Sequence, residues 1–379
     1  MSVVVAHCRA GFEPEAAADL AAVAAAAGTT VEVDAPPGRG YVVATPRTFD
    51  AQRWPRALDA APPVFVRSLF FGTGPHALFA DDAATRGRPD RVAPLAALLA
   101  AFRRDCRQPG IGVRHRAAAV FGELRMETAD TNDGKELSGL CRRLELPLAG
   151  ELLADGALAE HDDADTPTVL PALHVLFAHG AEVCIGVSAP PWGSRWAMGI
   201  PRLRMPRGAP SRSTLKLAEA IQAFLGDQAG DLLRGGMKAV DLGAAPGGWT
   251  WQLVQRGLRV TAVDNGPLKG EVAEDPLVTH LRVDGLTYVP RRPVDWMVCD
   301  IVDQPSRIAA LVARWIAEGH ARGTIFNLKL PMKKRYDEML RCRAIIDDAL
   351  ARSRLRHRLQ LRQLYHDREE VTGIVLRTG

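Results

Sequence analysis

A glycine-rich stretch, residues 237–250, constrains the fold of this chain more than any other feature. Its letters read Met-Lys-Ala-Val-Asp-Leu-Gly-Ala-Ala-Pro-Gly-Gly-Trp-Thr. The apolar residues around Val240 predict a short buried strand, and the glycines after it predict a tight turn into a helix. Glycine suits such a turn because a Cβ would keep a ligand away from the backbone. The helix N-terminus that follows offers free N–H groups to a carboxylate.

The residues after this turn predict a nucleoside ligand. Residues 260–264 read as a second strand that ends in Asp264, about 20 residues past the turn, where such folds bind a ribose diol. The spacing Gly-x-Gly-x-x-Gly is absent, which favours a ligand smaller than a dinucleotide. S-adenosylmethionine fits, because its adenosine suits the acids and its amino-acid carboxylate suits the turn. We therefore expect the cofactor to lie across four residues of the turn, Ala245, Pro246, Gly247 and Gly248.

The C-terminal half predicts an α/β fold, with strands and helices alternating as in a doubly wound, Rossmann-like sheet. The expected strands are 239–242, 260–264, 281–283, 296–300 and 324–328, followed by a helix over 336–353 and a hairpin of 358–365 with 371–377. Asp264, Asp284 and Asp300 each close one of these strands. A lone acid there is usually a helix cap. Three on successive strands predict one pocket, with Asp264 on the ribose and Asp284 near the adenine.

The 379 residues predict two or three domains. Residues 1–71 and 72–189 each mix strands and helices as a small α+β unit, and residues 190–379 hold the predicted sheet. The expected elements include a helix over 135–143, a strand over 111–116 and a hairpin of 173–177 with 183–187. Pro190 and Pro191 begin a candidate linker. These patterns predict two α+β units before an α/β domain.

Composition excludes several classes of protein. The net charge of +4 does not by itself indicate a nucleic-acid binder. The 6 cysteines are scattered without a Cys-x-x-Cys pair, so neither a zinc ribbon nor a disulfide framework is expected, and no metal is required. No signal peptide and no apolar run of about 18 residues are found, so we expect a cytoplasmic protein without a membrane partner.

Four arginines lie close together before the predicted sheet, at Arg202, Arg204, Arg207 and Arg212. One reading is a solvated connector. The other is a strip that contacts phosphates beside the active site.

Two lysines suggest the chemistry. Lys329 lies in an otherwise apolar strand, where lysine is seldom buried without a task, although a strand-end lysine can also reach solvent. Lys216 comes one helix before the glycine turn. A ribose 2′-hydroxyl is a weak acid, and its methylation needs a base in contact with it. A lysine serves only when neutral, and both burial and a second ammonium lower its pKa.

The C-terminal half resembles the FtsJ-like RNA ribose 2′-O-methyltransferases. Residues 240–249 match the cofactor loop of that family almost letter for letter. The resemblance implies a catalytic Lys-Asp-Lys-Glu tetrad of Lys216, Asp300, Lys329 and Glu370. Glu369 is the rival for the last position.

Within that family, residues 190–379 are most similar to the bacterial 23S ribosomal RNA 2′-O-ribose methyltransferases M. The stretches that carry this likeness are 198–203, 211–217, 263–267, 296–300, 324–336 and 363–371. The resemblance implies methylation of a cytidine in the peptidyl-transferase region of 23S ribosomal RNA or its precursor. It also implies a ferredoxin-like unit over 1–71, a THUMP RNA-binding domain over 72–189, and a serine at the cofactor, Ser213 or Ser211.

The residues that other enzyme classes require are not found in this sequence. Amino-methylating enzymes commonly carry Asp/Asn-Pro-Pro-Tyr after the fourth strand, where this chain has Asp-Ile-Val-Asp at 300–303. A cytosine C5 enzyme needs a nucleophilic cysteine in that loop, but Cys299 falls inside the strand. An NAD-dependent oxidoreductase would need a pyrophosphate-sized glycine loop. A non-catalytic ribosome-assembly protein is disfavoured because all four tetrad positions are present.

Overall fold

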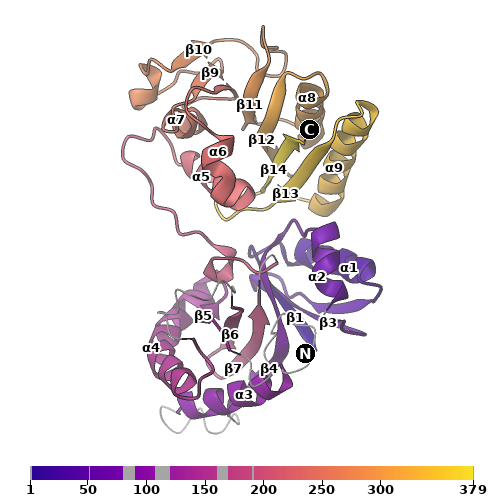
Figure 1. Cartoon of the computed structure of the whole chain (residues 1–379), viewed down its shortest axis with the longest axis vertical. Coiled ribbons are helices and arrows are strands. Elements are labelled where there is room, and N and C mark those ends of the chain that lie inside the picture. The colour runs from indigo at the N-terminus through magenta and orange to yellow at the C-terminus, as the bar shows by residue number, and fades with distance from the viewer. Residues whose placement is uncertain are drawn as a thin grey trace. The chain divides into compact units, whose positions relative to one another are not determined.

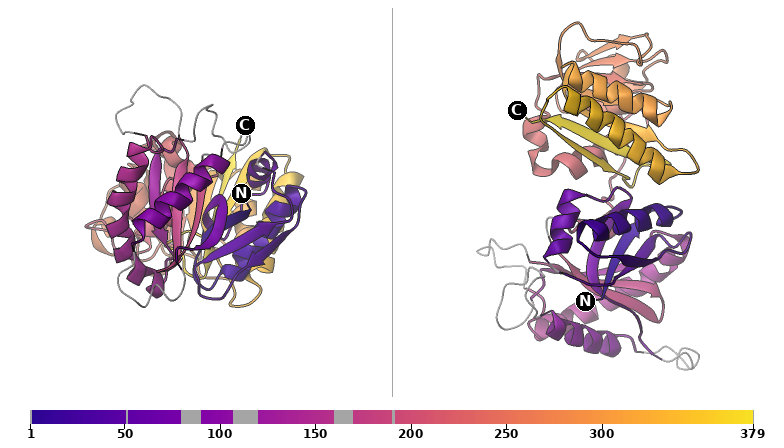
Figure 2. Two further views of the ribbon diagram at one scale, coloured as in Figure 1. Left: turned by 90° about the horizontal axis from the view of Figure 1, so that it is seen from below. Right: turned by 90° about the vertical axis from the view of Figure 1, so that its right-hand side faces the viewer.

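The computed structural model describes residues 2–50, 52–79, 90–106, 120–159, 170–189 and 192–378. The chain forms two compact units, Met1–Ile200 and Pro201–Gly379, and each is built on a seven-stranded sheet (Figure 1 and Figure 2). Residues 190 and 191, at the start of the expected linker, lie outside the described residues.

The N-terminal unit is a largely antiparallel sheet with helices. Its strands are β1 (Val3–Cys8), β2 (Val31–Asp34), β3 (Tyr41–Pro46), β4 (Val66–Ala77), β5 (Glu123–Thr128), β6 (Ala172–His179) and β7 (Glu182–Ser188). Its helices are α1 (Glu13–Ala26), α2 (Arg53–Ala60), α3 (Val92–Asp105), α4 (Asn132–Ala154) and the 3-10 turn η1 (Ala197–Gly199). The strand order is β2-β3-β1-β4-β7-β6-β5, and β5 with β6 is the parallel pair.

One sheet runs through both expected N-terminal units. The expected boundary at residues 71 and 72 falls inside β4, which pairs with β1 on one side and with β7 on the other. The expected hairpin around residues 179 and 180 is confirmed as β6 and β7. The expected helix over 135–143 was too short, because α4 continues to Ala154 through Pro147 with its buried side chains still at helical spacing. The expected strand over 111–116 lies outside the described residues.

The C-terminal unit alternates strands and helices as expected. Its strands are β8 (Lys238–Leu242), β9 (Arg259–Val263), β10 (Val278–Leu281), β11 (Val294–Cys299), β12 (Ala321–Lys329), β13 (His357–Arg362) and β14 (Glu370–Arg377). Its helices are α5 (Thr214–Leu225), α6 (Ala229–Leu232), α7 (Gly248–Val254), α8 (Pro305–Ala317) and α9 (Arg335–Arg352), with 3-10 turns η2 (Gly226–Gln228) and η3 (Gly270–Ala273).

The strand order β10-β9-β8-β11-β12-β14-β13 is that of a doubly wound sheet with an antiparallel hairpin at one edge. Helices α5 and α7 contact each other on one face, and α8 and α9 pack together on the other (Figure 1). From β8 the sheet grows toward β9 and β10 on one side and from β11 toward β12 on the other, so the order in which strands are added reverses between the parallel neighbours β8 and β11. Ligands of such sheets bind outside the carboxyl ends of the strands at this switch point.

The expected strand over 281–283 was wrong, because β10 covers Val278–Leu281 instead. The parallel register pairs Val278 with Val260 and Leu281 with Val263. Since β9 ends at Val263, residues beyond Leu281 have no strand to pair with. Strands β8, β11 and β12 are almost wholly buried, which explains why they read as continuous apolar runs. Among the described helices, none is long and apolar enough to cross a membrane.

Candidate active site

The turn after β8 fits only glycine at two positions. Gly247 has φ of 112°, in the left-handed region, and a Cβ there would lie 2.6 Å from Cγ1 of Val272. A Cβ on Gly248 would lie 2.3 Å from Oγ of Ser213 and 2.5 Å from Oγ of Ser211. The backbone of the turn is therefore packed closely against neighbouring side chains, and the glycines are needed for this packing.

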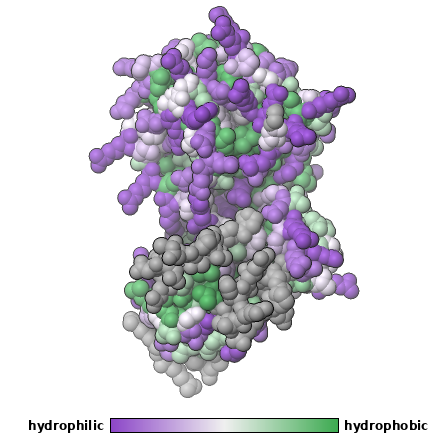
Figure 3. Space-filling view, in the orientation of Figure 1, coloured by the Kyte–Doolittle hydropathy of each residue, from purple (hydrophilic) through white to green (hydrophobic). Residues whose placement is uncertain are grey.

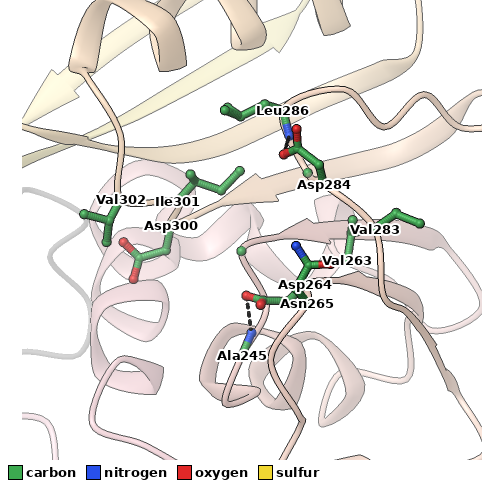
Figure 4. A pocket seen from close by; sticks show the side chains of 12 residues that line it. Ala245, Val263, Asp264, Asn265, Val283, Asp284, Leu286, Asp300, Ile301 and Val302 are labelled. Atoms are coloured by element: carbon green, nitrogen blue, oxygen red, sulfur yellow. Dashed lines mark hydrogen bonds between the residues drawn. The ribbon is translucent and has the colours of Figure 1, made fainter.

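A cavity of about 270 Å³ opens beside this turn at the carboxyl edge of the sheet (Figure 4). Asp264, Asp284 and Asp300 all line it, as does Ala245. Asp264 directly follows β9 and Asp300 directly follows β11, whereas Asp284 stands three residues after β10. The structure thus brings the three acids to one pocket.

The acids differ in how they are held. Asp264 accepts hydrogen bonds from the backbone N–H of Ala245 at 3.0 Å and of Gly266 at 2.7 Å, so its carboxylate is fixed against the turn. Asp284 is exposed and caps the backbone N–H of Leu286 at 2.9 Å. The cavity therefore has a fixed acid next to the turn, which is the arrangement expected for a ribose-binding acid.

Both candidate serines stand beside the turn. The hydroxyl oxygens of Ser211 and Ser213 lie 2.7 Å apart, and both approach Gly248. Both therefore lie just before or at the start of α5, against the loop expected to hold the cofactor. This position does not distinguish which of the two serines contacts the cofactor.

The four tetrad candidates form one cluster of ions from four elements. Nζ of Lys216, in α5, lies 2.7 Å from Oε2 of Glu370 and 3.7 Å from Oδ2 of Asp300. Nζ of Lys329, at the end of β12, lies 2.5 Å from Oδ1 of Asp300 and 3.1 Å from Oε1 of Glu370. Each lysine thus contacts both carboxylates. Since Asp300 also lines the cavity, the cluster adjoins the expected cofactor site.

The structure separates Glu370 from its neighbour. Glu370 is the register partner of Lys329 across β12 and β14. Successive strand residues point to opposite faces, so Glu369 points away, and its Oε2 lies 2.9 Å from Nη1 of Arg335. Glu370 therefore contacts both lysines, whereas Glu369 contacts Arg335.

The charge balance of the cluster keeps Lys329 protonated while the site holds no substrate. Burial of the ammonium lowers its pKa, but the carboxylates of Asp300 and Glu370 outweigh burial, so the pKa of Lys329 is raised above its ordinary value. A base at this position therefore needs a further change in its surroundings before it can accept a proton.

Sequence reasoning missed two buried polar residues near the site. Asn327 is fully buried, and its Nδ2 donates to Oδ1 of Asp300 and to Oε2 of Glu370, both at 3.0 Å. Its spacing of two from Lys329 on one strand was the available signal, because it places both side chains on one face. Asp241 in β8 is also fully buried, and burial raises its pKa to about 7.

The alternative chemistries find no support in these residues. Burial raises the pKa of Cys299 to about 12, which leaves an unreactive thiol inside β11. Within the described ranges, no group of three or more His, Cys, Asp or Glu is placed to hold a metal ion.

Three known families match successive parts of the chain. The family described as FtsJ-like methyltransferase matches residues 209–316. The families described as ribosomal RNA large subunit methyltransferase M, N-terminal, and RlmM ferredoxin-like domain match residues 90–189 and 1–70. The cofactor of this chain is therefore S-adenosylmethionine, and its C-terminal unit is a methyltransferase domain.

Relatives that match over nearly the whole chain include two proteins named ribosomal RNA large subunit methyltransferase M. The chain is 48% identical over 377 residues to the ribosomal RNA large subunit methyltransferase M of Azoarcus sp. (strain BH72), covering 98% of this chain and 95% of the relative. It is 46% identical to the protein of that name from Methylococcus capsulatus, covering 99% and 98%. Among solved structures, TrmN from Thermus thermophilus aligns over 100% of both chains with 16% identity and a TM-score of 0.36.

Proposed function

This chain belongs to the family of ribosomal RNA large subunit methyltransferases M, and we propose that it methylates the ribose 2′-hydroxyl of a cytidine in the peptidyl-transferase region of 23S ribosomal RNA. The observation that carries the proposal is the cluster in which Lys216 and Lys329 each contact both Asp300 and Glu370. A hydroxyl acceptor must lose a proton during transfer, and this cluster offers a lysine for that task beside the cofactor pocket.

Bound S-adenosylmethionine supplies a methyl group that its sulfonium already activates. In the proposal the backbone of residues 245–248 and Ser213, or Ser211, hold its amino-acid end. Asp264 accepts hydrogen bonds from the ribose hydroxyls, and Asp284 lies near the adenine. Asp300 belongs to the tetrad and also contacts the cofactor. The support is the cavity that the three acids and Ala245 share, beside the closely packed glycines of the turn.

Lys329 is the proposed base for the 2′-hydroxyl proton. Its raised pKa must fall when the substrates bind. Two effects act in that direction: repulsion from the Lys216 ammonium, and exclusion of water by RNA, which removes solvation from a charge. Glu370 and Asp300 keep the two ammonium groups close together, so proton loss from Lys329 relieves their repulsion. Glu370 also orients the lysines.

Residues 1–189 and the arginine strip are proposed to capture the RNA. All four arginines of the strip are exposed. Hydrophilic side chains cover much of the visible face of the C-terminal unit, with smaller apolar patches between them (Figure 3). A domain that selects one loop in a large RNA needs such phosphate contacts in addition to its catalytic pocket.

The experiment is methylation of total ribosomal RNA with labelled cofactor, followed by mapping of the labelled nucleotide. We expect label on one cytidine ribose of 23S RNA. Glu370→Gln should lose most of this transfer, while Glu369→Gln, whose side chain pairs with Arg335, serves as the matched control and should retain it. Label on a base, or in 16S RNA, would contradict the proposal.

A further inference from the structure

Three polar side chains are buried beneath the tetrad without belonging to it. Asn327 of β12 and Thr372 of β14 are both fully buried and are register partners. Asp367, in the turn before β14, is 1% exposed. Buried polar groups are expected to form hydrogen bonds. In these three residues, Asn327 contacts Thr372, and Thr372 contacts Asp367.

The chain of contacts begins at the tetrad. The amide nitrogen of Asn327, Nδ2, donates one hydrogen bond to Asp300 and one to Glu370, each at 3.0 Å. The two carboxylates repel each other, and neither can donate when ionised. An amide NH₂ has two donors and so can fix both carboxylates at once. This demand sets the orientation of Asn327, because its carbonyl oxygen must then point away from the tetrad.

That carbonyl oxygen faces Thr372. Oγ1 of Thr372 lies 2.8 Å from Oδ1 of Asn327, and since the carbonyl only accepts, the hydroxyl must donate. A hydroxyl has one proton. Thr372 therefore has none left for Asp367, whose Oδ1 and Oδ2 lie 3.1 Å and 2.9 Å from the same hydroxyl oxygen.

Asp367 completes the chain only as a neutral acid that donates to Thr372. Its Oδ2 also accepts the backbone N–H of Leu364 at 2.9 Å, which an acid can do while it donates its proton to Thr372. Burial raises the pKa of Asp367 to about 8, with the charges of Glu370 and Glu219 acting in the same direction. Glu219 itself is bound by Nδ1 of His366 at 2.6 Å.

We propose that Asn327, held by Thr372 and protonated Asp367, is a positioning residue that fixes Asp300 and Glu370 for methyl transfer, and that ionisation of Asp367 loosens this arrangement at alkaline pH. Ionised Asp367 takes the Thr372 proton for its own hydrogen bond and leaves the Asn327 carbonyl without a donor. The inference rests on the proposed function of the tetrad.

The first test is Thr372→Val, which removes the hydroxyl and keeps the shape of the side chain. We expect the single-turnover rate of methyl transfer at neutral pH to fall by about tenfold, because a buried carbonyl loses its donor. Cofactor affinity should stay within about twofold. Thr324→Val is the matched control: Thr324 is a fully buried residue of β12 whose hydroxyl has no hydrogen-bond partner among the described residues.

The second test is Asp367→Asn, whose amide can donate to Thr372 at every pH. The ratio of its rate to the wild-type rate should be near constant below pH 8 and rise above it. Below pH 8, where Asp367 is neutral in the wild type, titration of Lys329 affects both proteins alike and cancels in the ratio. A purely structural role of Asp367 would give no such pH dependence.

The inference is overturned if Thr372→Val and Thr324→Val transfer methyl groups equally fast, or if the Asp367→Asn ratio stays flat from well below to well above pH 8. Mapping of the label reports separately on the proposed function. A label on a base would refute 2′-O-methylation while the ratios still decide the role of Asn327.

Discussion

Replacing Lys329 by arginine separates the charge of this residue from its capacity to lose a proton. A guanidinium keeps its positive charge beside Asp300 and Glu370, whose oxygens lie 2.5 Å and 3.1 Å from the lysine nitrogen. It does not release its proton at any pH where the protein is folded. Arginine therefore retains the ion pairs of the cluster and removes only the base.

The expected loss follows from what a positioned base contributes. General bases contribute about 10²- to 10⁴-fold, which corresponds to roughly 3–5 kcal/mol at about 1.4 kcal/mol per tenfold. Lys329→Arg should lose rate in this range, with little change in cofactor affinity. Lys216→Arg is the comparison, because it sits against the same two carboxylates. It keeps its charge and its repulsion toward Lys329, so we expect it to lose only about tenfold.

The assay is single-turnover transfer of labelled methyl groups to ribosomal RNA, with calorimetry for the cofactor. Because the pKa of Lys329 is raised, only a small neutral fraction exists at neutral pH, and that fraction grows tenfold per pH unit. Below pH 8, where Asp367 is still protonated, the wild-type rate should rise with pH with a slope near one on logarithmic axes, and Lys329→Arg should show no such rise. If Lys329→Arg keeps a rate within about tenfold of wild type, Lys329 only positions charge and another base must act.

Three further predictions concern other parts of the chain. Gly248→Ala should weaken cofactor binding by about tenfold in calorimetry, because its Cβ would lie 2.3 Å from Oγ of Ser213, while Gly230→Ala, with nothing within 4 Å of its Cβ, should bind normally. Asp241 has a folded pKa of about 7, above its value of 3.8 in the unfolded chain, so the folded state binds the extra proton and stability falls as pH rises through that window. In urea unfolding, the free energy of unfolding of Asp241→Asn minus that of wild type should therefore increase with pH up to about pH 7 and stay constant above it. A difference that is the same at every pH would contradict this. Alanine should replace three exposed arginines together, Arg202, Arg204 and Arg207. RNA affinity should fall, the slope of log affinity against log salt concentration should become shallower by about 0.7 to 0.9 per lost phosphate contact, and cofactor affinity should not change.

Local sequence was enough for the parts of the site that depend on chain neighbours. The cofactor turn was readable because glycine spacing, an apolar strand before it and a helix after it are all encoded within residues 237–250. The convergence of Asp264 and Asp300 was also predictable, since parallel strands place their carboxyl ends at one edge. The pairing of β6 with β7 followed from alternation around a short turn.

Tertiary structure alone decided what depends on partners distant in the chain. The start of β14 determines that Glu370, and not Glu369, faces Lys216 and Lys329, because one step along a strand reverses the side chain. The place of β10 was set by where β9 ends. The spacing of two places Asn327 on the same face as Lys329, but it does not identify its partners. Its two carboxylate partners come from residues 27 and 43 positions away, and no local pattern records such a pairing.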